Sequence, residues 1–337
     1  MSSNISSFSI EDLISLKDNR KWFHLCDLIP EIINDHNSEE ILSIFLQNIS
    51  QYHPASLVHA TLSLSKHFSP EKSIEIISNS ISSIKESNMY SGNFKMEIVN
   101  LEIQKCILQV QTDQLNDIES QIFKFKEFEM TPEVYKLFNF LAFLYYEKSG
   151  NHENCVKYLL EYVKKNNEEI NNLELLAKYS LVSRKFFNFI EIFSLKNFDK
   201  INEDIYKIYI AVQEGNTKLV DKYIKIIHNI FGDKYQIVRE KAYFIGLINL
   251  CFKENKRILG FEKIQEELEI REEEINGFLL KALGFGLIKG WIDDKNKVLY
   301  FNTIIPRCLQ EAELNKMKNK FGEWKEKIRQ AIEMIEQ

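Results

Sequence analysis

The seven histidines and five cysteines are the side chains best suited to metal binding or nucleophilic catalysis in this sequence. A hydrolytic zinc site needs closely spaced histidines and a downstream carboxylate, as in H-E-x-x-H or in two histidines one residue apart. The histidines match neither spacing, and the cysteines form no C-x-x-C pair. The histidines are His24, His36, His53, His59, His67, His152 and His228. We therefore expect no metal site.

Two pairs of residues have types that could do nucleophilic or acid–base chemistry. His152 and Cys155 lie one helical turn apart, but no third group is placed to orient the histidine. Cys155 borders an apolar helical stripe, so we interpret it as a core thiol. Asp293 and Asp294 begin the run Asp-Asp-Lys-Asn between two strand candidates, which is typical of a polar hairpin turn. We expect no catalytic residue and predict that the chain is not an enzyme.

The composition favours helices over sheets. The 337 residues include 11 glycines and 5 prolines, which are about half and a third of average usage. Sheet-rich folds need these residues at turns. Rossmann and P-loop enzymes also need glycine-rich turns against phosphate, which are absent, so no cofactor is expected. The simplest chain that turns so seldom is a stack of helices.

Charge and cysteine usage indicate the compartment and limit the partners. The net charge of −6 argues against nucleic acid as a partner. The N-terminus shows no secretory signal. The sequence contains no run of about 18 apolar residues, so we expect neither a membrane span nor a membrane partner. The five cysteines are odd in number and far apart, which favours reduced thiols. We expect a cytoplasmic and nuclear protein.

Residues 1–237 are predicted to form a right-handed helical, tetratricopeptide-like solenoid. Ser38–Tyr52 carries an apolar stripe after Ser38 as its N-cap. Ser69-Pro70 and Thr131-Pro132 each pair a capping residue with a proline suited to the first helical turn. After Thr131-Pro132, two helices joined by Gly150-Asn151 form a hairpin of about 34 residues, the length of a tetratricopeptide repeat.

Residues 238–303 show a different pattern, which predicts a winged-helix module. A helix over 238–254 precedes a short helix over 261–268, a third helix over 272–283 and strands over 287–292 and 297–301. From Arg257 to Phe301 there are seven Lys and Arg residues against nine Asp and Glu residues. This balance disfavours insertion of the third helix into a DNA groove.

The last predicted segment, 304–337, contains a long helix over 311–337 with a strict heptad repeat. We call its apolar positions the seam. The seam consists of Leu314, Met317, Phe321, Trp324, Ile328, Ala331 and Ile335. A narrow apolar stripe on a long helix needs partner helices, so we expect other polypeptides to cover it. The open alternative is that the helix folds back on the solenoid of its own chain.

The order of these elements resembles the PCI domain family, whose members occur in the proteasome lid, the COP9 signalosome and translation initiation factor 3. Residues 261–301 carry the resemblance. The family signature positions are matched by Leu287, Gly290, Ile292 and Asp293.

Three further runs are similar to the family of 26S proteasome non-ATPase regulatory subunit 13, a PCI subunit of the lid. The first is Ile305-Pro306-Arg307 with Met317-Lys318 and Trp324 downstream. The second is Tyr145-Tyr146 followed by Gly150-Asn151-His152, and the third is Phe187-Asn188-Phe189.

The resemblance implies a non-catalytic scaffold that assembles into a hetero-oligomer. PCI subunits join through their winged helices, and their terminal helices gather in a bundle. The implied partners are other lid PCI subunits and, through the bundle, the lid deubiquitinase pair. The expected partner-binding residues are the seam together with Leu287, Trp291, Val298 and Tyr300.

Other assignments remain open at this point. Within the same architecture they are subunit m of translation initiation factor 3 and a COP9 signalosome subunit. Outside it, a free tetratricopeptide-type adaptor would bind peptides in its solenoid.

Overall fold

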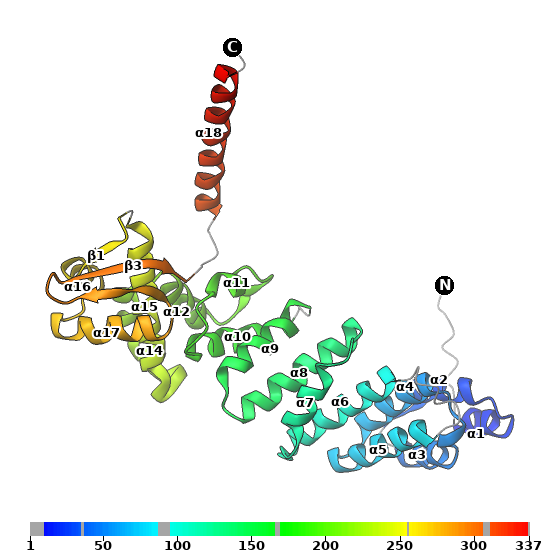
Figure 1. The fold of residues 1–337 in the computed structure, drawn as a ribbon. Helices are drawn as coiled ribbons and strands as arrows, with labels where there is room; N and C mark the ends of the chain where they lie inside the picture. Colours follow the sequence, from blue (N-terminus) through cyan, green and yellow to red (C-terminus); the bar gives the residue numbers. More distant parts are fainter. Residues whose placement is uncertain are drawn as a thin grey trace, which may run out of the picture. The chain divides into compact units, whose positions relative to one another are not determined.

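The computed structural model describes residues 10–34, 37–86, 95–165, 169–254, 256–305 and 311–335. The side chains of residues 311–314, 316 and 335 lie outside this description. The described chain is mainly helical, with one small sheet near its C-terminal end (Figure 1), which confirms the predicted fold class. Within the described residues, no helix combines the length and apolarity that crossing a membrane requires.

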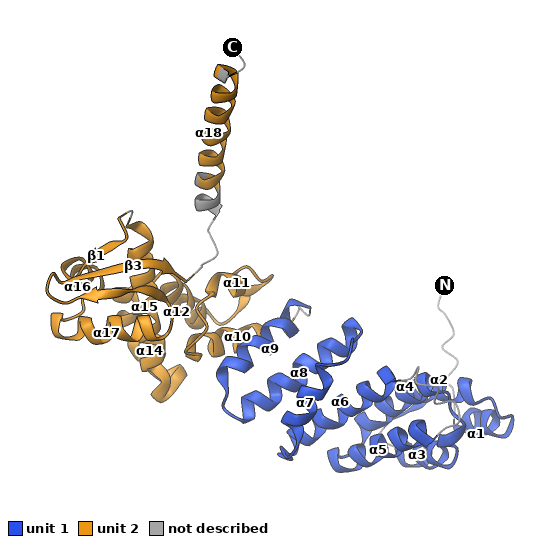
Figure 2. Ribbon diagram, viewed as in Figure 1, with its two compact units in different colours: residues 1–166 blue, residues 167–337 orange. Residues whose placement is uncertain are grey.

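By compactness the chain forms two units, residues 1–166 and 167–337 (Figure 2). The predicted division at 237 and 303 instead followed the change from one type of element to another, and it stays a prediction.

Unit 1 is built of helices that pack on helices one or two positions away along the chain (Figure 1). Its α-helices are α1 (Ile10–Asp18), α2 (Trp22–Ile32), α3 (Ser38–Gln47), α4 (Pro54–Leu64), α5 (Pro70–Glu86), α6 (Lys95–Gln111), α7 (Ile118–Phe125), α8 (Pro132–Lys148) and α9 (His152–Lys164). Helix α5 packs on α6, α6 on α8, and α8 on α9. Each amphipathic helix therefore buries its apolar face against adjacent helices, as in a solenoid.

The hairpin of α8 and α9 forms where the sequence predicted it. Thr131 caps α8, because its Oγ1 accepts a hydrogen bond from the Val134 amide at 3.4 Å. Gly150 has a φ of +72°, which favours glycine after a helix end. Asn151 then caps α9 by accepting from the Asn154 amide at 3.2 Å. Proline and capping residues thus set both ends of the hairpin.

Two local details of unit 1 differ from expectation. Asn37, not Ser38, precedes α3, and the helix ends at Gln47 before a short 3₁₀ turn over Ile49–Gln51. The Asn48 side chain donates a hydrogen bond to the Ile44 carbonyl oxygen at 3.3 Å, and this bond supplies a donor to a carbonyl group in the last turn of α3.

Unit 2 is organised around its long helix α15 (Tyr235–Lys253), which packs on α10, α12, α13, α14, α16, β1 and β3. The preceding α-helices are α10 (Ile170–Val182), α11 (Phe189–Phe193), α12 (Glu203–Gln213), α13 (Thr217–Lys222) and α14 (Ile224–Phe231). The elements that follow are β1 (Ile258–Gly260), α16 (Phe261–Leu268), α17 (Glu272–Gly284), β2 (Ile288–Asp293), β3 (Val298–Ile304) and α18 (Glu311–Ile335).

A buried lysine joins α15 to the end of α10. Lys241 is 2% exposed, and its Nζ donates to the Ser180 carbonyl at 2.6 Å and to the Ser183 carbonyl. The rings of Phe187 and Phe189 lie 5.2 and 5.1 Å from the same Nζ. A buried cation is tolerated only when such partners replace water. The Phe187-Asn188-Phe189 run therefore has a structural role at this joint.

The winged-helix module contains the predicted short helix, third helix and hairpin as α16, α17, β2 and β3, and it adds one strand. Strand β1 pairs antiparallel with β3, so the strand order is β1-β3-β2. The sequence prediction missed β1, because three residues ending in Gly260 are too short for an alternating pattern to show. The inward side chains of this sheet join the core formed by α15, α16 and α17.

Candidate assembly surfaces

Asp293 and Asp294 are occupied in stabilising the hairpin turn between β2 and β3. Asp293 Oδ1 accepts from the amides of Lys295 at 3.1 Å and Asn296 at 3.0 Å. Asp294 Oδ1 accepts from Asn276 Nδ2 at 2.8 Å and Lys297 Nζ at 2.9 Å. These hydrogen bonds lower the pKa of both carboxyls, with the Asn296 amide the largest cause for Asp293 and Asn276 for Asp294. A general acid at neutral pH needs the opposite shift.

The four thiols that the structure describes are buried. Burial raises the pKa of Cys26, Cys106 and Cys251 to about 12, whereas a reactive thiol needs a lowered pKa. Cys155 is fully buried on α9, in agreement with its interpretation as a core thiol. Cys308 lies outside the described residues.

Across the described chain, no group of three or more His, Cys, Asp and Glu side chains gathers in a way that could hold a metal ion. His36 lies outside the described residues.

The wing presents an aromatic outer face. Trp291 on β2 lies directly opposite Tyr300 on β3, and their rings stack at 5.1 Å with 13° between their planes. Trp291 is 54% exposed, and Val298 and Tyr300 are half-buried. Alternation along β3 turns Leu299 and Phe301 inward to the core. Three of the four predicted wing residues therefore share this outer face.

Leu287 is placed differently from the other predicted wing residues. Its side chain is 1% exposed and belongs to the core of the module. The Leu287 amide donates to the Ala282 carbonyl at 3.1 Å, and its carbonyl accepts from the Ile305 amide at 2.7 Å. Leu287 thus supports the wing from inside.

Strand β2 is an edge of the described sheet, because β3 is its one neighbour there. Its register with β3 shifts between Lys289 and Gly290. A Cβ at Gly290 would lie 2.0 Å from the Tyr300 carbonyl oxygen, so only glycine fits this bulge. The bulge sets the direction of Trp291, the next residue.

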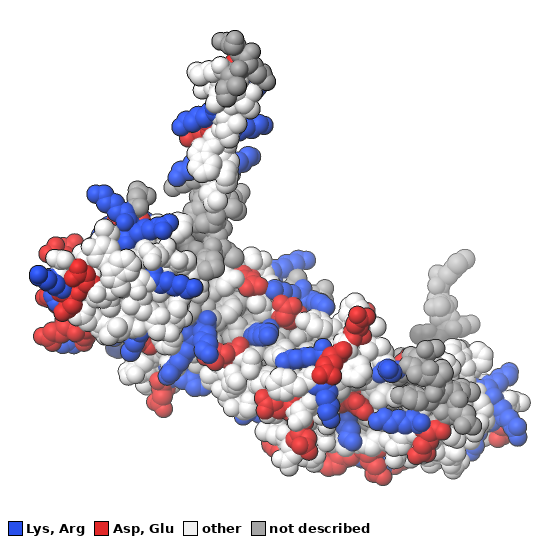
Figure 3. All heavy atoms as spheres, viewed as in Figure 1, with Lys and Arg blue, Asp and Glu red and all other residues white. Residues whose placement is uncertain are grey.

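The seam of α18 is exposed wherever its side chains are described. Met317, Phe321, Trp324 and Ile328 are 41, 56, 60 and 61% exposed, and Ala331 is also exposed. In Figure 3 uncharged side chains run along α18 with Lys and Arg on either side. Leu314 and Ile335 complete the predicted seam, but their side chains lie outside the description.

The heptad pattern did not include two further exposed apolar side chains of α18. Ile332 is 49% exposed and Met334 is 78% exposed. They widen the apolar surface near the end of the helix, because Ile332 follows the seam residue Ala331 and Met334 precedes the seam residue Ile335. A wider stripe can contact more than one partner helix.

No family model matches the chain. It is similar to the "26S proteasome non-ATPase regulatory subunit 13" of Dictyostelium discoideum, with 32% identity over 103 residues, or 30% of this chain and 27% of that protein. It is also similar to the "26S proteasome regulatory subunit RPN9" of Saccharomyces cerevisiae, with 25% identity over 161 residues, or 45% of this chain and 41% of that protein.

A third relative carries a different name. The "Eukaryotic translation initiation factor 3 subunit M" of Dictyostelium discoideum is 19% identical over 278 residues, which is 78% of this chain and 68% of that protein. The chain spans well under two thirds of the length of the first two relatives. The resemblance to regulatory subunit 13 is nevertheless confirmed, because relatives named either regulatory subunit 13 or RPN9 match from several eukaryotes.

Proposed function

We propose that this chain, a relative of the 26S proteasome non-ATPase regulatory subunit 13 and RPN9 proteins, is a structural subunit of the lid of the proteasome regulatory particle. In this role it holds neighbouring subunits in register for ubiquitin-dependent protein degradation. The observation that carries the proposal is the exposed seam of α18. Four of its large apolar side chains are between 41 and 61% exposed, and such a stripe is typical of a helix that other helices cover.

The wing supplies a second contact surface in this proposal. Within the described part of the chain β2 pairs with β3 alone, so its outer edge can add a strand of another chain. The adjacent Trp291 and Tyr300 stack adds a large aromatic surface, which is common at the centre of protein interfaces. The proposed partners at the wing are other PCI subunits of the lid. The proposed partners of α18 are the terminal helices of those subunits and of the lid deubiquitinase pair.

The proposed role is non-catalytic. Support comes from the pKa directions of the candidate groups, because the paired aspartates are more acidic than usual and three buried thiols are less acidic. The name of the Dictyostelium relative likewise describes a non-ATPase regulatory subunit. The proposed compartments are the cytoplasm and the nucleus.

The test places aspartate in the seam and asks whether the subunit still enters its complex. Phe321→Asp combined with Ile328→Asp removes two side chains that are 56 and 61% exposed, so the isolated chain should keep its fold. We expect loss of incorporation into the proteasome on native gels, because a bundle cannot bury two carboxylates without partners.

A matched control separates the seam from the helix itself. Asn319→Asp with Gln330→Asp adds the same two negative charges at exposed positions of α18 that lie away from the seam. This control should incorporate normally. Normal incorporation of the seam variant, or equal loss with both variants, would refute the bundle role.

The second candidate is subunit M of translation initiation factor 3, which the third relative favours. Purification of the tagged chain from its source cell distinguishes the assignments. Co-elution with proteasome ATPases supports the lid, and co-elution with 40S ribosomes supports the initiation factor. Co-elution with neither set, and a monomeric chain, supports a free peptide-binding adaptor.

A further inference from the structure

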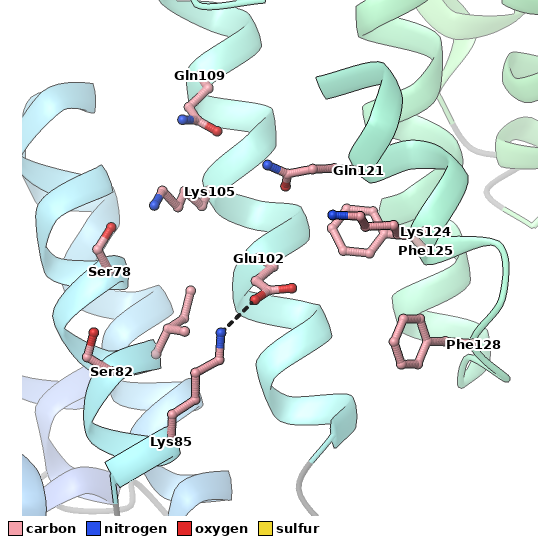
Figure 4. Close-up of a pocket in the computed structure, with 11 residues that line it drawn as sticks. Ser78, Ser82, Lys85, Glu102, Lys105, Gln109, Gln121, Lys124, Phe125 and Phe128 are labelled. Atoms are coloured by element: carbon pink, nitrogen blue, oxygen red, sulfur yellow. Dashed lines mark hydrogen bonds and ion pairs between the residues drawn. The ribbon is translucent and has the colours of Figure 1, made fainter. Parts of the chain in front are cut away.

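We propose that a lysine-lined pocket in unit 1 binds an acidic peptide segment of another protein. The pocket lies between α5, α6 and α7 and has a volume of about 450 Å³ (Figure 4). Ligand sites commonly have volumes of about 300–1,000 Å³, so a short stretch of peptide fits. This inference concerns a surface separate from the wing and from α18, and it does not depend on the proposed lid role.

Charge is the first observation that supports the proposal. Lys85 on α5, Lys105 on α6 and Lys124 on α7 line the pocket, whereas Glu102 is the one acidic residue among the described lining. The pocket is therefore positive on a chain whose net charge is −6. Local charge of one sign in a concavity attracts ligands of the opposite sign.

Pairing within the pocket leaves two lysines for a ligand. Lys85 Nζ contacts Glu102 Oε1 at 3.2 Å (Figure 4). Lys105 and Lys124 have no ion pair among the residues that the structure describes. They come from different helices, α6 and α7, and both line the pocket.

A glutamine adds an oriented hydrogen-bond donor. The buried Cys106 thiol donates to Gln121 Oε1, with 2.9 Å between sulfur and oxygen. The side-chain amide nitrogen of Gln121 is then left to donate into the pocket, where Figure 4 places this side chain between α6 and α7. Such a donor suits a carboxylate or a peptide carbonyl.

The apolar part of the lining favours a peptide over a small inorganic anion. Ile81 and Phe125 are 8 and 3% exposed and form apolar walls, while Phe128 is 40% exposed. An apolar ligand side chain would bury surface against Phe128, whereas a phosphate ion would gain nothing from this part of the lining. Glu102 also repels a compact polyanion, whereas an extended peptide can keep its carboxylates away from it.

Fluorescence anisotropy with the full chain tests the proposal. The probe is a fluorescein-labelled hexapeptide in which five glutamates surround one phenylalanine, and the control probe carries glutamine in place of each glutamate. We expect the acidic probe to bind at least about tenfold more tightly, with an affinity that falls as salt rises. Equal binding of the two probes would overturn the proposal.

Variants then locate the binding site. Lys105→Glu with Lys124→Glu should weaken the acidic probe at least about tenfold, and Lys105→Gln with Lys124→Gln should weaken it less. The matched control, Lys21→Glu with Lys66→Glu, makes the same change in net charge at exposed lysines outside the pocket. It should change the affinity less than about twofold, since distant charges are screened.

Circular dichroism melting establishes that each variant is folded, and the neutral glutamine pair keeps the test valid if the glutamate pair unfolds. Equal weakening by the pocket pair and the control pair would show attraction to net charge alone and would refute the site. Complete displacement of the probe by excess inorganic phosphate would show a small-anion site and would also refute the peptide assignment.

Discussion

Gly215 and Gly246 bring the α12–α13 turn against the middle of α15, and this contact permits a quantitative test. Gly215 has a φ of +65°, and a Cβ there would lie 2.4 Å from the Gly246 nitrogen and 2.9 Å from the Ile245 carbonyl carbon. Both atoms belong to the backbone of α15 and cannot move independently. We therefore expect Gly215→Ala to separate the turn from α15.

The matched control is Gly150→Ala in the α8–α9 turn. Gly150 has a φ of +72°, but nothing lies within 4 Å of its added Cβ. This substitution carries only the strain of a left-handed conformation, about 1 kcal/mol. Gly215→Ala adds overpacking of about 1–3 kcal/mol, so its total cost should be about 2–4 kcal/mol.

Gly246→Ala should cost less than Gly215→Ala although it touches the same contact. Its Cβ would lie 2.7 Å from Leu268 Cδ2, a side-chain atom that can rotate away, and 3.1 Å from the Gly215 oxygen. Alanine is also favoured over glycine inside a helix by about 1 kcal/mol. The two effects oppose each other, and we expect a net cost below about 1 kcal/mol.

Urea unfolding followed by circular dichroism measures the three free energies of unfolding. Hydrogen exchange then shows whether protection is lost in α12, α13 and α15 for Gly215→Ala and in α8 and α9 for Gly150→Ala. Equal costs for Gly150→Ala and Gly215→Ala would refute the reasoning, because the backbone contact would then contribute nothing beyond conformational strain.

Two further predictions concern pH and thiol chemistry. Asp221 accepts from Arg239 Nε at 2.6 Å and from the Tyr243 hydroxyl at 2.9 Å; burial opposes ionisation, but these bonds prevail and lower its pKa below its ordinary 3.8. The free energy that ionised Asp221 contributes to folding is present at neutral pH and is lost as the pH falls below about 4. Asp221→Asn should therefore lower the free energy of unfolding by about 1 kcal/mol at pH 7 after solvent screening, and by less in acid, as measured by urea unfolding midpoints. An equal loss at both pH values would contradict this prediction. Iodoacetamide at pH 8 should modify Cys26, Cys106 and Cys251 only after unfolding, because burial raises each thiol pKa to about 12; rapid labelling of the native chain, mapped by mass spectrometry, would disprove it.

Part of the candidate surface was predictable from local sequence, and part was not. The seam of α18 follows from spacing along one helix, so the periodicity of Met317, Phe321, Trp324 and Ile328 was enough to identify it. The wing needed tertiary structure, because whether a side chain points inward depends on strand pairing and on what covers each face. Only the fold distinguishes Leu287, which is 1% exposed, from Trp291, which is 54% exposed.

The lysine-lined pocket was beyond sequence analysis for the same reason. Lys85, Lys105 and Lys124 belong to three helices, and on each helix they resemble ordinary solvated charges. Lys241 shows the opposite case, since a lysine among apolar residues would be assigned to the surface, yet it is 2% exposed.

The helical class, the ends of the α8–α9 hairpin and the seam follow from local sequence, because prolines, capping side chains and helical spacing act within a few residues. The pairing of Ile258 with Tyr300, the approach of Gly215 to Gly246 and the burial of Lys241 depend on the packing of distant segments. The two backbone contacts join residues that are 31 or more positions apart. The Lys241 ammonium group is buried against carbonyl groups that are even more distant in the sequence. The stability of these contacts depends on the simultaneous placement of several elements, which no local pattern records.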